Sequence, residues 1–120
     1  MTRTIAVTAV AASFAVAAAA PAGVHKAATT KNLAADPDGD LTFTKTRMSA
    51  ARGRVTLVMK NPASSGLPHG IGIKRKRGEN VDPGGTSRVS IRLTPGTYTY
   101  YCTVAGHRAA GMKGRLTVRR

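Results

Sequence analysis

Short runs of alternating apolar and polar residues recur along this chain, and they constrain its fold more than any other feature. They cover residues 41–45, 55–59, 69–73, 88–93, 97–102 and 115–118. Alternation of this kind places successive side chains on opposite faces of a β-strand. Asn-Pro, Asp-Pro-Gly-Gly and Thr-Pro-Gly segments lie between several of the runs, and such residues favour turns. The pattern predicts a β-sandwich or barrel of antiparallel strands.

The N-terminal part of the chain has a different composition. Residues 1–22 contain a positively charged start at Arg3, an apolar stretch over residues 5–20, and the small-residue sequence Ala20-Pro21-Ala22. This layout is typical of a secretory signal peptide. A retained transmembrane anchor is the alternative, but the stretch is short and weakly apolar for crossing a bilayer. We therefore expect a protein that is secreted, periplasmic or at the cell surface.

Residues 23–39 mix Ala, Thr, Lys, Asp and Pro without periodicity. Such a segment is typical of a flexible linker. The sequence thus predicts three parts: a signal peptide at residues 1–22, an N-terminal linker at 23–39, and one β-domain at 40–120.

Cys102 is the only cysteine of the chain, so an internal disulfide cannot form. It could be a buried inert thiol, half of an intermolecular bridge, or a metal ligand. An exposed thiolate in an oxidising compartment is lost to oxidation. Something must therefore protect the sulfur.

Three residues with metal-binding side chains follow one another in one predicted loop: Cys102, His107 and Met112. His69 begins an upstream run whose isoleucines share its strand face, so we expect its side chain to point inward. Structural zinc sites use Cys and His without Met, and hard cations require carboxylates. Two imidazoles and a thiolate with a weak axial thioether are typical of blue-copper electron-transfer sites.

The runs "NPASSGLPHGIGI" and "GGTSRVSIRLTPGTYTYYCTVAGHRAAGMKGRLTV" resemble the cupredoxins, the plastocyanin/azurin type of blue copper protein. They are similar to the small plastocyanin-like domains of exported bacterial proteins, over residues 41–118. The resemblance implies a Greek-key β-sandwich of about seven to eight strands. It also implies one copper ion, with His69 and His107 as imidazole ligands, Cys102 as the thiolate and Met112 as the axial thioether.

One position departs from this family pattern. Many plastocyanins and azurins have Asn directly after the first histidine ligand, whereas this chain has Gly70. Glycine offers no side chain to tie the His69 segment to the cysteine loop, and such supporting contacts tune a metal site. We expect Thr103, next to the cysteine, to supply a compensating hydrogen bond.

The implied function is one-electron transfer between Cu(II) and Cu(I), and the protein is not expected to be an enzyme. Copper binding or delivery without electron transfer is the alternative. A basic module that binds polyanions is a third class, but it leaves the Cys-His-Met spacing unexplained.

The chain is strongly basic, with 19 Lys and Arg residues against 5 Asp and Glu residues and a net charge of +14. This charge favours an acidic partner or an anionic membrane surface. Export and the small number of aromatic residues argue against nucleic acid. We expect a monomer that meets an acidic redox protein, with residues 74–77 either a solvated turn or part of the docking surface.

Overall fold

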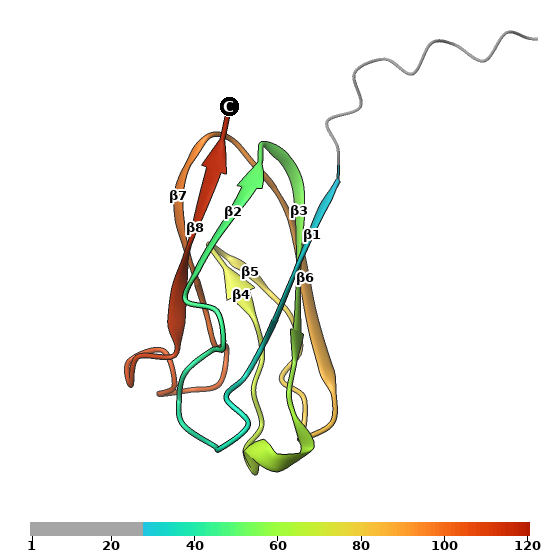
Figure 1. The fold of residues 1–120 in the computed structure, drawn as a ribbon, viewed down its shortest axis with the longest axis vertical. Coiled ribbons are helices and arrows are strands. Elements are labelled where there is room, and N and C mark those ends of the chain that lie inside the picture. Colours follow the sequence, from blue (N-terminus) through green and yellow to red (C-terminus); the bar gives the residue numbers. More distant parts are fainter. Residues whose placement is uncertain (1–27) are drawn as a thin grey trace, which may run out of the picture.

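The computed structural model describes residues 28–120, in which eight strands form two facing sheets (Figure 1). The strands of the first sheet, in spatial order, are β1 (Thr29–Ala34), β3 (Gly53–Lys60) and β6 (Thr86–Leu93). Those of the second are β2 (Arg47–Ala51), β8 (Lys113–Arg119), β7 (Gly96–Tyr101), β4 (Gly72–Ile73) and β5 (Lys76–Arg77). A 3-10 turn, η1, covers Ala63–Ser65. The predicted β-sandwich is confirmed.

Alternation explains the long strands. In β3, Val55, Leu57 and Met59 are fully buried, while Arg54 and Lys60 are exposed. Burial of one apolar face against the other sheet drives this arrangement. The predicted runs at 55–59, 88–93, 97–102 and 115–118 correspond to β3, β6, β7 and β8.

Two strand pairs differ from the antiparallel arrangement that the sequence predicts. Strand β1 runs parallel to β3, and β2 runs parallel to β8. Both β1 and β2 lie at sheet edges, and the chain passes from the first sheet to the second between β1 and β2. Parallel neighbours require such a crossover, because a short hairpin can join only antiparallel strands.

The predicted linker at residues 23–39 is wrong over the part that the structure describes. Residues 29–34 form β1 and pair along their full length with β3. Leu33 and Ala35 are buried in the core. An edge strand with one large inward side chain lacks the alternation that identifies strands in sequence. The predicted signal peptide at 1–22 lies outside the described residues and stays a prediction.

Two other predicted runs are not continuous strands. Residues 41–45 form a loop in which Phe43 makes an isolated bridge with Ala35, and β2 begins at Arg47. In the run 69–73, only Gly72–Ile73 is a strand, and His69 forms an isolated bridge with Val81. The run 41–45 resembles a strand because the Phe43 side chain points into the core, where it is 3% exposed.

Tyr100 is fully buried in the core of the sandwich. Its ring packs against Phe43 with 5.8 Å between centroids, and its hydroxyl donates to the Lys45 carbonyl at 2.6 Å. Burial raises the pKa of Tyr100 from its ordinary value of 10.0 to about 12, so the hydroxyl remains a donor into the alkaline range. No helix among residues 28–120 is long and apolar enough to cross a bilayer.

Replacing Leu33 tests whether β1 is part of the domain. We expect Leu33→Ala to lower the free energy of unfolding by about 2–5 kcal/mol, because it leaves a cavity in a packed core. Leu67→Ala is the control, since Leu67 is 39% exposed. Equal urea denaturation midpoints for the two variants would show that residues 29–34 act as a linker.

Candidate metal centre

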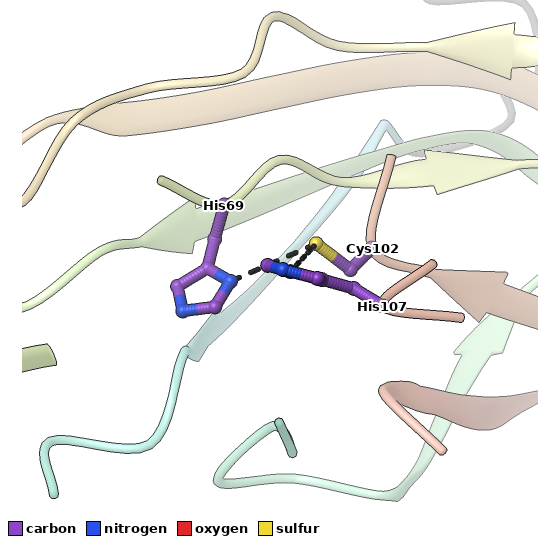
Figure 2. Close-up of side chains that lie close together, drawn as sticks. All are labelled: His69, Cys102 and His107. Atoms are coloured by element: carbon purple, nitrogen blue, oxygen red, sulfur yellow. Dashed lines mark hydrogen bonds between the residues drawn. The ribbon is translucent and has the colours of Figure 1, made fainter. Parts of the chain in front are cut away.

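Two segments bring three metal-binding side chains to the end of the sandwich away from the C-terminus (Figures 1 and 2). His69 lies in its bridge with Val81, just before β4. Cys102 directly follows β7, and His107 lies in the loop between β7 and β8. Strands β4 and β7 are antiparallel neighbours, with Gly72 opposite Tyr101. This pairing places His69 beside Cys102 although they are 33 positions apart in sequence.

The three donor atoms have spacings suited to one metal ion. The Cys102 sulfur is 3.7 Å from Nδ1 of His69 and 3.5 Å from Nδ1 of His107. All three donor atoms lie within 4.8 Å of one another. Bonds of about 2.0 Å to nitrogen and about 2.3 Å to sulfur, at angles of about 110–120°, require nitrogen–sulfur separations of about 3.5–3.7 Å. The donor set therefore fits a late first-row transition metal.

Burial protects the centre and keeps the His69 imidazole in its metal-binding form. His69 is fully buried and Cys102 is 1% exposed, while His107 is partly exposed. Burial, and secondarily the neighbouring His107, lower the pKa of His69 from its ordinary value of 6.5. The neutral ring, which is the metal-binding form, therefore persists to lower pH.

The orientation of His69 comes from its backbone and its packing. Its N–H donates to the Val81 carbonyl at 3.0 Å, and its carbonyl accepts from the Val81 N–H at 2.8 Å. Its ring centroid lies 5.1 Å from that of His107. Nδ1 faces the sulfur, while Nε2 is buried without a hydrogen-bond partner among the described residues.

Backbone hydrogen bonds close the loop that carries the other candidate ligands. The Cys102 N–H donates to the Met112 carbonyl at 3.0 Å, and the Met112 N–H donates to the His107 carbonyl at 3.0 Å. The Met112 side chain is fully buried and belongs to the same apolar cluster as Cys102. All four residues expected from the sequence thus lie in the two segments at this end of the fold.

Asn61 supports the His69 segment and was not identified from the sequence, where Asn-Pro indicates only a turn. Its buried amide nitrogen donates to the carbonyls of Leu67 at 2.8 Å and Val81 at 3.0 Å. Its side-chain oxygen accepts from the Ser65 hydroxyl at 2.5 Å. Buried side-chain amides that are fully bonded in this way fix loop geometry.

Asn80 fills the space beside Gly70 and is a second contact that the sequence did not identify. The Thr103 hydroxyl donates to Oδ1 of Asn80, which links the residue after Cys102 to the residue before Val81. A Cβ at position 70 would overlap Thr103 Oγ1 and lie 2.6 Å from Asn80 Oδ1. Position 70 is glycine because this hydrogen-bonded pair occupies the volume of a side chain. Thr103 does supply the expected bond, but its partner comes from the loop after β5.

Comparison with known proteins agrees with this geometry. Residues 28–119 match the family model described as copper binding proteins, plastocyanin/azurin family. The chloroplastic plastocyanin major isoform of Arabidopsis thaliana is 33% identical over an alignment of 93 residues, gaps included, that covers 68% of this chain and 54% of the plastocyanin. Auracyanin-B of Chloroflexus aurantiacus is 51% identical over 39 residues, 32% of this chain and 17% of the auracyanin. The chain therefore spans about half or less of the length of these curated relatives.

Solved structures show the same fold. Auracyanin B superposes with a TM-score of 0.67 at 26% identity, covering 77% of this chain and 89% of the auracyanin. Reduced auracyanin from Roseiflexus castenholzii has a TM-score of 0.66 at 25% identity, with 77% and 98% coverage. Copper nitrite reductase from Nitrosomonas europaea matches at 0.63 and 21% identity over 77% of this chain and 41% of its own, which shows a shared fold alone.

The family match covers almost the whole described domain, and the histidine–cysteine–histidine donor set lies where copper requires it. The chain belongs to the plastocyanin/azurin family of copper-binding proteins, with His69, Cys102 and His107 arranged to bind one copper ion.

Proposed function

We propose that this protein is a type 1 (blue) copper protein that carries single electrons outside the cytoplasm. The observation that carries the proposal is the buried contact of one cysteine sulfur with two imidazole nitrogens, at 3.7 and 3.5 Å. A bound copper ion supplies one-electron chemistry between Cu(II) and Cu(I). The residues of the chain hold the ion, exclude water and keep the donors in place.

Met112 is proposed as the fourth, weaker donor. Its full burial and its backbone bond to His107 support this role, since both fix the thioether segment beside the other donors. A thioether is a soft ligand, and the axial ligand helps to set the reduction potential. Cys102, His69 and His107 are the three strong donors of the proposal.

Rigidity of the donor segments favours electron transfer. Little rearrangement accompanies a one-electron step when the donors are held in place before it. Here the bridge between His69 and Val81, the loop bonds of Met112 and the tie between Thr103 and Asn80 restrain the segments that carry the donors. A copper-delivery protein requires donors that a receiving protein can reach, whereas His69 and Cys102 are buried. We therefore favour the carrier over delivery.

We propose that electrons enter and leave the centre through His107, the partly exposed donor. Small residues surround it in the loop, including Ala105, Gly106 and Ala109, so a partner can approach closely.

A protein donor set with the thioether as fourth member leaves no open position of the kind that metal catalysis uses. This supports a carrier rather than an enzyme. The export pattern of residues 1–22 supports a location outside the cytoplasm, and the charge of +14 supports an acidic redox partner.

Replacing the sulfur tests the proposal directly. We expect the oxidised copper protein to be intensely blue through thiolate-to-copper charge transfer, and Cys102→Ser to abolish the colour, because Cys102 is the only cysteine. Visible absorption spectra of the two copper-loaded proteins make the comparison. A Ser variant as blue as the parent would disprove the assignment.

Met112→Leu tests the fourth donor. We expect the variant to keep copper and to have a higher reduction potential, because loss of a thioether donor disfavours Cu(II) more than Cu(I). Protein-film voltammetry measures the shift, and Met59→Leu is the matched control because Met59 is equally buried in β3. Equal potentials for the two variants would remove Met112 from the copper site.

Asn80→Ala tests the tie between the two ligand segments. We expect a loss of about 0.5–1.5 kcal/mol in unfolding free energy, as for one typical hydrogen bond, together with faster copper loss to a chelator. Asn32→Ala, also at an exposed asparagine, is the control. A double-mutant cycle with Thr103→Val should show coupling between positions 80 and 103. Additive effects would mean that the pair does not stabilise the centre.

A further inference from the structure

The outward face of the five-stranded sheet carries a row of cations centred on Tyr101. Strand register places Lys113, Tyr101, Gly72 and Arg77 directly opposite one another across β8, β7, β4 and β5. The next row places Arg47 opposite Arg115. Opposed residues share a sheet face. We call this face the Tyr101 surface, and its cations are Arg47, Arg77, Arg108, Lys113 and Arg115.

Tyr101 holds two of these cations in place. Its ring lies over Gly72, where a Cβ would come within 2.9 Å of ring atoms. The Arg108 guanidinium lies 4.2 Å and the Arg77 guanidinium 5.8 Å from the ring centroid. The Tyr101 hydroxyl donates to the Lys74 carbonyl at 2.7 Å, which fixes the ring. Guanidinium groups held on an aromatic face lose less conformational entropy when they bind a ligand.

Part of the Tyr101 surface is a hollow that four of its cations line. The hollow measures about 480 Å³, and Arg47, Arg108, Lys113 and Arg115 line it together with Thr46 and Thr99. None of the residues that line it is acidic. Guanidinium groups bind carboxylates through paired hydrogen bonds. The hollow therefore suits carboxylate side chains that project from a partner.

We propose that the Tyr101 surface docks the acidic face of the partner protein with which this chain exchanges electrons, an inference that rests on the proposed function. Arg108 belongs to this surface and follows His107 directly, so a partner seated here covers the loop that carries the partly exposed ligand. The hollow is concave and lined by four cations, so it suits a protein whose carboxylate side chains project into it. The surface thereby combines recognition of the partner with access to the copper.

A second basic face provides a matched control. On the three-stranded sheet, Arg54 lies directly opposite Arg92, and both side chains are exposed. Arg47 and Arg115 form the equivalent opposed pair on the Tyr101 surface. Changing either pair to glutamine removes the same charge and relieves the same like-charge repulsion. None of the four residues is a proposed ligand.

The experiment compares three copper-loaded proteins: the parent, Arg47→Gln/Arg115→Gln, and Arg54→Gln/Arg92→Gln. A deca-glutamate peptide is titrated into the reduced, diamagnetic forms and followed by amide chemical shifts. We expect shifts concentrated in β7, β8 and the loop between them, and a Kd at least about fivefold weaker for Arg47→Gln/Arg115→Gln. The Arg54→Gln/Arg92→Gln control should change by less than about twofold. Equal weakening of both variants, or shifts spread over both sheets, would overturn the proposal.

Three further measurements complete the test. Arg77→Gln, on the other side of Tyr101, should also weaken peptide binding, and unchanged binding by this variant would count against the surface. Vesicles of phosphatidylcholine and phosphatidylglycerol replace the peptide in a separate titration. If Arg47→Gln/Arg115→Gln lost more vesicle binding than peptide binding, the surface would be assigned to a membrane instead. Voltammetry of the parent protein separates this proposal from the proposed function. A reversible one-electron couple would support the carrier function even if the peptide did not bind selectively, and that lack of selective binding would disprove the docking surface.

Discussion

A single sulfur atom in contact with two imidazoles is the arrangement that the rest of this fold serves. The Cys102 sulfur lies 3.7 and 3.5 Å from the ring nitrogens of His69 and His107. The two segments that meet here are far apart in sequence, so the contact exists only when β4 pairs with β7. Bringing such segments together costs chain entropy, which burial of the sandwich core must offset. The same burial shields the thiol from oxidation.

Supporting contacts reach the centre from both segments. Asn61 bonds the carbonyls of Leu67 and Val81, so the chain enters His69 along a defined path. The loop after β7 closes on itself through the backbone of Cys102 and Met112. These contacts form through amides and carbonyls and leave the donor atoms free. The protein's own hydrogen bonds therefore hold the segments that carry the donors, and supporting contacts of this kind orient the ligands of a metal site.

The sequence predicted the sandwich and the three residues of the copper-binding centre, His69, Cys102 and His107, because each was identified from a local pattern. Alternation is strong in β3, where three buried residues face inward, and the spacing of Cys102, His107 and Met112 lies within one loop. Strand β1 escaped prediction because only Leu33 on it is fully buried, and its partner β3 is more than twenty residues downstream. The alternation at 41–45 was misleading because Phe43 enters the core from a loop. Contacts such as that of Asn80 with Thr103 join residues 23 positions apart, and no local pattern encodes them.

The glycine at position 70 depends on the residues at two other positions. While Thr103 and Asn80 are bonded, any side chain at 70 overlaps them, so Gly70 is the only residue that this pair tolerates. A Cβ at position 70 would also lie 2.9 Å from the backbone carbonyl of Glu79, so shortening position 80 or position 103 alone does not make room for a side chain there. Any side chain at 70 would therefore have to separate Thr103 from Asn80 and displace the backbone at Glu79 as well. The absence of a side chain at 70 thus lets the segment after His69 and the segment after Cys102 approach closely enough to be joined by this one hydrogen bond.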